Sequence, residues 1–142
     1  MNDNESKGCE RLICNITGGV QPKSIGRRRS VVDLNSGNGT RLEVKWSGAT
    51  LTYQWQWNVR GELVIHDYDR IILVGANPGN PTDHYRYIFD VPKRWILAWH
   101  KPTILCSYNP VKPSDYGYAL HNWFACTREQ LADWYGNQPR LS

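Results

Sequence analysis

The sequence predicts a single α/β domain, with strands in the middle of the chain and short helices near its two ends. Its 142 residues match the usual size of one domain. Apolar residues at helical spacing indicate a helix over residues 5–16, and apolar–polar alternation indicates strands between residues 30 and 89. Hydrophobic residues make up 40% of the chain and aromatic residues 12%, enough to form a buried core.

The amino-terminal helix is predicted from Leu12, Ile13 and Ile16, which lie at helical spacing before the stop signal Gly18-Gly19. A loop then contains Pro22, Gly26 and the basic run Arg27-Arg28-Arg29. This loop is expected to lead into a strand at residues 30–34.

A β-hairpin is predicted around Asn38-Gly39, a dipeptide that favours a tight turn between two strands. In the second arm, charged and apolar residues alternate, so each kind occupies one face of the strand. The charged residues are Arg41, Glu43 and Lys45, and the apolar residues are Leu42, Val44 and Trp46. Pairing of the two arms would bring Asp33 close to Glu43 and Lys45.

The rest of the chain supplies further strands and a carboxy-terminal helix. Alternation predicts strands at residues 52–59 and 85–89, the second of them in another hairpin, and the apolar run Arg70–Gly75 is expected to be a central strand covered on both faces. Residues 101–118 are interpreted as an irregular covering loop around a core of about residues 7–100. Thr127-Arg128-Glu129-Gln130 has the form of a capping box and predicts a final helix.

Asp33, Glu43 and Lys45 form the candidate catalytic group. Mg²⁺ prefers oxygen ligands and commonly needs only one or two carboxylates, with waters and substrate phosphate completing its shell. Asp33 and Glu43 are therefore candidate metal ligands, with the Val44 carbonyl as a third, and their carboxyl groups should approach within about 4 to 5 Å. Lys45 lies on the same face as Glu43, where its ammonium would orient water or stabilise phosphate charge.

Asp33 with Glu43-Val44-Lys45 resembles the active site of the PD-(D/E)xK nuclease superfamily, which includes restriction endonucleases and Holliday-junction resolvases. Lys7-Gly8-Cys9-Glu10 and the basic loop Gly26-Arg27-Arg28-Arg29 match the family pattern in order, so the resemblance covers about residues 7–75. Val32 replaces the family's proline, and a strand-like segment replaces the usual helix after the lysine.

The resemblance implies a restriction-endonuclease-like mixed central β-sheet flanked by helices, in one domain over residues 1–142. It implies an Mg²⁺-dependent endonuclease, with Mn²⁺ as a substitute ion, that hydrolyses DNA and forms a homodimer. Glu10 would supply an additional metal or water contact. The alternative is a catalytically inactive nuclease fold that binds nucleic acid or another protein.

Several residues allow two interpretations. Arg27, Arg28 and Arg29 would contact backbone phosphates, or they form a solvated loop. Gln54 and Gln56 would contact the scissile phosphate or metal-bound water, or they are the polar face of a half-exposed strand. Trp55 and Trp57 are expected in the core, with stacking on bases as the alternative.

Composition narrows the remaining possibilities. The formal net charge of +4 slightly favours a polyanionic partner. No apolar run is long enough to span a membrane, and the polar amino terminus does not resemble a signal peptide, so a soluble cytoplasmic protein is expected. The four cysteines and four histidines lack the spacing of metal sites, and the cysteines are expected to be free thiols.

Overall fold

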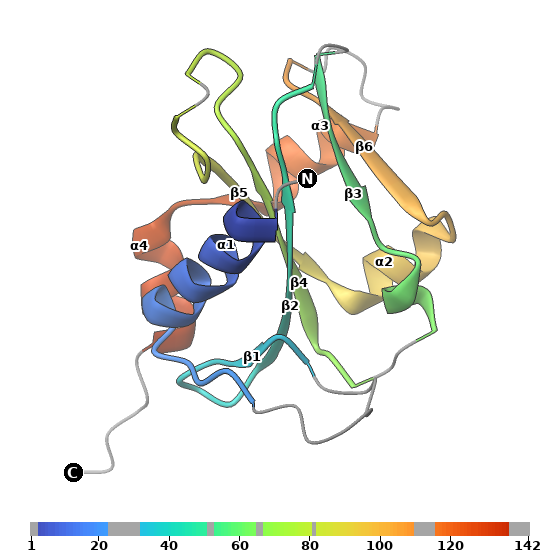
Figure 1. Cartoon of the computed structure of the whole chain (residues 1–142). Coiled ribbons are helices and arrows are strands. Elements are labelled where there is room, and N and C mark those ends of the chain that lie inside the picture. Colours follow the sequence, from blue (N-terminus) through green and yellow to red (C-terminus); the bar gives the residue numbers. More distant parts are fainter. Residues whose placement is uncertain are drawn as a thin grey trace, which may run out of the picture.

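A five-stranded mixed sheet divides the molecule into two layers (Figure 1). The structure, a computed structural model, describes residues 3–22, 32–50, 53–64, 67–80, 82–109 and 116–136. The strand order is β1-β2-β4-β5-β7, and β3 and β6 form a second sheet. Strand bounds are β1 Leu34–Asn35, β2 Arg41–Ser47, β3 Gln54–Asn58, β4 Arg70–Gly75, β5 Tyr87–Pro92, β6 Thr103–Ser107 and β7 Ala125–Cys126.

The helices are mostly short. They are α1 Asp3–Ile16, α2 Lys93–Trp99, α3 Tyr116–Ala119 and α4 Arg128–Leu131, with a 3₁₀ turn η1 at Gly61–Leu63 and π-type turns η2 at Leu120–Phe124 and η3 at Ala132–Gly136. Helices α1 and α4 cover one face of the main sheet, and the β3–β6 sheet lies with α2 and α3 on its other side (Figure 1). The expected α/β class with a mixed sheet is therefore confirmed.

The predicted hairpin is present at the edge of the main sheet. Strand β1 pairs antiparallel with β2, placing Leu34 opposite Leu42, and Gly39 takes the positive φ of 89° in the turn. Strand β2 then pairs in parallel with β4, and β4 pairs antiparallel with β5. The central strand at Arg70–Gly75 is confirmed, because β4 lies between β2 and β5 with residues 71–75 buried.

Helix α1 confirms the amino-terminal prediction and ends where its glycines begin. The Gly19 N–H donates to the Cys14 carbonyl at 2.8 Å, and the Gly18 N–H donates to Asn15 at 3.3 Å. This is the Schellman arrangement, in which the φ of 61° at Gly18 suits glycine. The apolar side of α1 packs on the main sheet within a cluster that includes Cys9, Ile13 and Val44.

The other face of the sheet packs against an aromatic core. Trp55 and Trp57 of β3 are buried, and their indole N–H groups donate to the carbonyls of Ala76 and Val74 at 2.9 and 3.0 Å. These bonds satisfy the polar edges of the two rings and join the second layer to β4. The expectation that both tryptophans belong to the core is confirmed.

Some expectations were wrong in extent or kind. Of the strand expected at residues 30–34, residues 30 and 31 lie outside the described residues, and β1 begins only at Leu34. The strand expected at 85–89 runs from Tyr87 to Pro92. Helix α2 was not predicted. Residues 101–118 are not simply a covering loop, because β6 lies among them and pairs with β3. The expected sheet flanked by helices is found on one face only, because the β3–β6 sheet lies with α2 and α3 on the other face of the main sheet.

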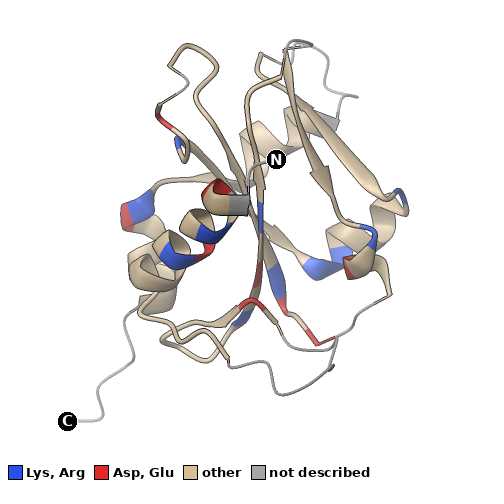
Figure 2. Cartoon of the chain, in the orientation of Figure 1, with Lys and Arg blue, Asp and Glu red and all other residues tan. Residues whose placement is uncertain are grey.

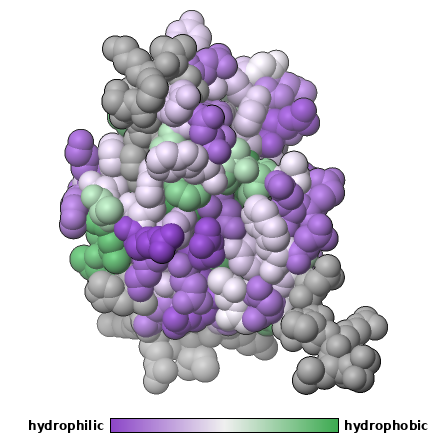
Figure 3. Space-filling model, turned by 180° about the vertical axis from the view of Figure 1, so that it is seen from behind, coloured by the Kyte–Doolittle hydropathy of each residue, from purple (hydrophilic) through white to green (hydrophobic). Residues whose placement is uncertain are grey.

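The predicted capping box is confirmed at α4. The Gln130 N–H donates to the Thr127 hydroxyl, and the Thr127 N–H donates to the Gln130 side chain. None of the helices in the described segments has the length and apolar character needed to cross a bilayer. On the face turned away in Figure 1, hydrophilic side chains predominate and the apolar ones form small patches (Figure 3).

Candidate active site at the edge of strand β2

Asp33 occupies the edge of β2 where β1 no longer pairs with it. The last pair of β1 with β2 joins Leu34 to Leu42, and the next outward backbone group, the Val44 N–H, donates to Asp33 Oδ2 at 2.8 Å. The carbonyls of Arg41 and Ser47 accept bonds from the residues flanking β4. In β2, the N–H and carbonyl groups of odd-numbered residues therefore point to β4. Those of even-numbered residues point to the opposite edge, so the Val44 carbonyl lies on the same edge as Asp33.

Three carboxyl groups converge at this edge. Those of Glu43 and Glu10 both interact with that of Asp33, which raises the pKa of each glutamate. They arrive from separate elements, with Glu10 on α1, Asp33 just before β1 and Glu43 on β2. Figure 2 shows both acidic (red) and basic (blue) positions along α1 and β2.

The crowding of these acids changes their titration. Burial, with the nearby charges of Asp33 and Glu62, raises the pKa of Glu43 from 4.5 to about 8. Burial and the charge of Asp33 raise the pKa of Glu10 from 4.5 to about 7. Near neutral pH the group therefore holds protons that a bound cation would displace.

Lys45 contributes the positive charge. Its Nζ lies 2.5 Å from Oε1 of Glu62, a residue of η1 that the sequence reading did not identify. Glu62 is 4% exposed, and its Oε2 has no hydrogen-bond partner among the described residues. No motif marks Glu62, because it meets Lys45 only when β3 folds back beside β2.

A pocket of about 330 Å³ opens beside Asp33, Glu10 and Lys45, whereas the buried Glu43 does not line it. Its lining residues come from α1, the segment before β1, β2 and β3; they are Ser6, Glu10, Asp33, Val44, Lys45, Trp46 and Asn58. The Trp46 indole N–H donates to the His84 carbonyl at 2.7 Å, which fixes one wall. Asn58 was not predicted, although it lies on the polar side of the alternating β3 segment.

The oxygen-rich donor set suits a hard divalent cation. No set of three or more His, Cys, Asp or Glu side chains in the described segments is arranged to hold one ion together. Two carboxylates with the Val44 carbonyl and waters would still be adequate for Mg²⁺, which usually retains several waters. Asp33 lines the pocket and accepts the Val44 N–H, and Glu43 precedes Val44 in β2 without lining the pocket.

The other sequence candidates lie away from this pocket or outside the described residues. Gln54 lines a separate cavity of about 360 Å³ with Trp99 and Lys101. Gln56 is exposed and its backbone N–H donates to the Ser47 hydroxyl. Arg27, Arg28 and Arg29 lie outside the residues that the structure describes.

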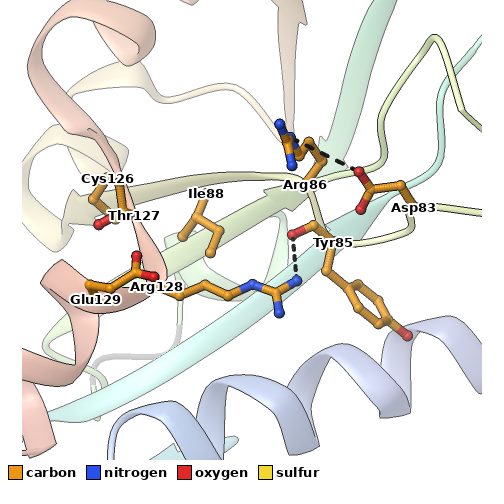
Figure 4. A pocket seen from close by; sticks show the side chains of 8 residues that line it. All are labelled: Asp83, Tyr85, Arg86, Ile88, Cys126, Thr127, Arg128 and Glu129. Carbon is orange, nitrogen blue, oxygen red and sulfur yellow. Dashed lines mark hydrogen bonds and ion pairs between the residues drawn. The ribbon is translucent and has the colours of Figure 1, made fainter.

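A larger cavity of about 460 Å³ lies between α4 and the segment before β5 (Figure 4). Its arginines already have partners: Arg128 donates to the Tyr85 carbonyl at 3.4 Å, and Arg86 lies 4.0 Å from Asp83. Burial raises the pKa of the Cys126 thiol in its wall to about 12, which leaves that sulfur unreactive. Size alone therefore does not make this cavity the better candidate.

The cysteines form no disulfide, as expected. Cys9, Cys14 and Cys106 are buried, Cys126 is partly buried, and all four are free. Burial raises the pKa of every one of these thiols. Their burial and raised pKa values favour the neutral thiol over the thiolate.

No family model matches the chain. Among curated proteins, none matches it either.

Proposed function

We propose that this protein is a metal-dependent DNA endonuclease with a PD-(D/E)xK site on a restriction-endonuclease-like fold. One observation carries the proposal: carboxyl groups from three separate elements converge at the edge of β2, where β1 no longer pairs with it. One of them belongs to Glu43, two residues before Lys45 in the same strand. Electrostatic crowding of this kind lowers stability. Carboxyl groups gathered in this way are suited to binding a cation.

The order of elements supports the proposed fold. A helix bearing Glu10 precedes a hairpin with Asp33 and Glu43 in its two arms, and β2 continues in parallel with an apolar strand. The β3–β6 sheet is a departure from a sheet flanked by helices alone. It places Asn58 at the pocket, so the added layer contributes to the site.

Each residue has a proposed role. Asp33 and Glu43, with the Val44 carbonyl, would hold Mg²⁺, for which Mn²⁺ would substitute. The bound ion would offset charge on the scissile phosphate and acidify a coordinated water. Lys45 would orient that water or the phosphate through its N–H donors, and Glu10 would accept a hydrogen bond from the water.

DNA is the proposed substrate. The net charge of +4 is compatible with a polyanion, and the Arg27 to Arg29 run would add phosphate contacts. A homodimer is proposed because two copies of one site would cut two strands.

A non-catalytic nucleic-acid-binding or protein-interaction module is the second candidate. The observation that favours it is the ion pair between Lys45 and Glu62, which already engages the ammonium group. In that case the acidic cluster would be a remnant of an ancestral site, and binding would not require metal.

Nicking of supercoiled plasmid with Mg²⁺ or Mn²⁺ tests the proposal. Wild type should nick, and Lys45→Ala or Asp33→Asn should reduce the rate by roughly 100-fold or more. Lys101→Ala and Asp133→Asn change the same residue types outside the pocket and should cleave normally. A wild-type protein that cleaves no supercoiled, linear or branched DNA with either metal would refute the enzyme proposal.

A further inference from the structure

Glu62 lies buried behind the candidate site, paired with Lys45 of the pocket lining. It lies in η1 directly after β3, where its N–H donates to the Val59 carbonyl at 3.1 Å. Its carbonyl accepts a bond from the buried Tyr68 hydroxyl at 2.6 Å. These bonds fix the main chain of Glu62, and the ion pair of its Oε1 with Lys45 joins its carboxylate to β2.

That carboxylate pairs with Lys45, which lines the pocket, but does not itself line it. The Lys45 side chain is 29% exposed, whereas the Glu62 side chain is 5% exposed. Lys45 therefore bridges a buried anion and the pocket that it lines. An ammonium has three N–H donors, so the pairing with Glu62 leaves two for groups in the pocket.

Stability alone gives Glu62 a poor rationale. Its Oε2 is buried without a partner among the described residues, and its charge adds to that of Glu43 close by. An unsatisfied buried oxygen is costly, and replacing a buried ion pair with apolar residues is often neutral or stabilising. Such an arrangement is expected where a reaction needs a group held in place.

We infer that Glu62 is a positioning residue for the reaction proposed at this site: it holds the Lys45 ammonium so that its two remaining donors face the attacking water and the scissile phosphate. This inference rests on the proposed nuclease function. It assigns to Glu62 no contact with DNA or metal. Its effect is transmitted through Lys45.

Substitutions at Glu62 distinguish positioning from a structural role. Glu62→Gln retains the shape but removes the charge, and Glu62→Leu also removes the unsatisfied oxygen. For both, we expect single-turnover nicking to slow by roughly 10- to 100-fold, as for other supporting residues. DNA affinity measured with Ca²⁺ should stay within about twofold of wild type, because Glu62 makes no DNA contact.

Stability provides the second measurement. Near-ultraviolet circular dichroism should show both Glu62 variants folded under the assay conditions, so loss of rate would not reflect unfolding. Urea unfolding should give them a lower midpoint than wild type, because Lys45 loses its buried counter-charge. Glu62→Gln combined with Lys45→Ala should be no slower than Lys45→Ala alone, because both act through one group. Glu129→Gln, an exposed glutamate of α4, is the matched control with normal activity.

Two failures are distinguishable. If wild type cleaves and both Glu62 variants cleave at the wild-type rate, or if the effects of Glu62→Gln and Lys45→Ala on rate are additive, Glu62 has no positioning role and the nuclease proposal survives. If wild type cleaves nothing, the proposed function fails, and the role of Glu62 fails with it. Should Glu62→Gln fold poorly, Glu62→Leu decides between the outcomes.

Discussion

Replacing Glu43 with glutamine should stabilise the protein at alkaline pH while removing its proposed metal site. The raised pKa of Glu43, about 8 against an ordinary 4.5, means that the folded state takes up a proton more readily than the unfolded state. The protonated Glu43 therefore stabilises the folded state fully below pH 4.5, and this stabilisation is lost as the pH rises to about 8. Glutamine cannot ionise, so the variant avoids that loss.

The magnitude follows from the same interval. Each pH unit corresponds to about 1.4 kcal/mol, and about 3.5 units separate the two values, giving an upper limit of about 5 kcal/mol at pH 8. The charge of Asp33 acts on both Glu10 and Glu43, so removing the Glu43 charge also reduces the repulsion among the remaining acids. We therefore expect Glu43→Gln to raise the free energy of unfolding by about 2 to 3 kcal/mol at pH 8 and by little at pH 5.

Urea unfolding followed by tryptophan fluorescence, with EDTA present, measures this difference at both pH values. Burial lowers the pKa of His121, so its contribution to the stability of the fold is lost as the pH falls below 6.5. This loss is equal in wild type and variant. Addition of Mg²⁺ at pH 8 should stabilise wild type more than the variant. If Glu43→Gln were no more stable than wild type at pH 8, or gained equally at both pH values, the inferred crowding would be refuted.

Three further predictions, on packing, helix capping and a buried hydrogen bond, use the same urea unfolding assay. Gly75→Ala should cost about 1 to 3 kcal/mol, since a Cβ there would lie 2.6 Å from the Trp55 ring, whereas Gly79→Ala, with its nearest contact at 3.5 Å, should be nearly neutral. Thr127→Ala should cost about 1 kcal/mol by removing the cap of α4, and Thr127→Ser should retain it. Tyr135→Phe should cost about 1 to 3 kcal/mol, because the buried Asp90 loses a hydrogen bond of 2.5 Å.

Local patterns in the sequence were sufficient to predict the elements nearest the site. Alternation from Arg41 to Trp46 and the Asn38-Gly39 turn define the hairpin, because side-chain period and turn chemistry are properties of adjacent residues. The glycines after Ile16 mark the end of α1 for the same reason. The same local features predict that Asp33 lies beside the second arm, where it accepts the Val44 N–H.

The elements that were missed depend on tertiary contacts. Helix α2 has the apolar run Trp95-Ile96-Leu97, which at this length is compatible with either a helix or a strand. Strand β6 is five residues long and has β3 as its partner, almost fifty residues earlier in the chain. Glu62 could not be predicted, since its pairing with Lys45 depends on how β3 returns beside β2.

The free edge of β2 has a consequence for self-association. Exposed strand edges are templates for pairing with another chain, and charged groups that point into an edge prevent such pairing. Asp33 already accepts the Val44 N–H, so this donor at the edge of β2 is not open to an incoming strand. Protein with Asp33→Ala, in which that N–H loses its acceptor, should be more prone to form intermolecular β-structure.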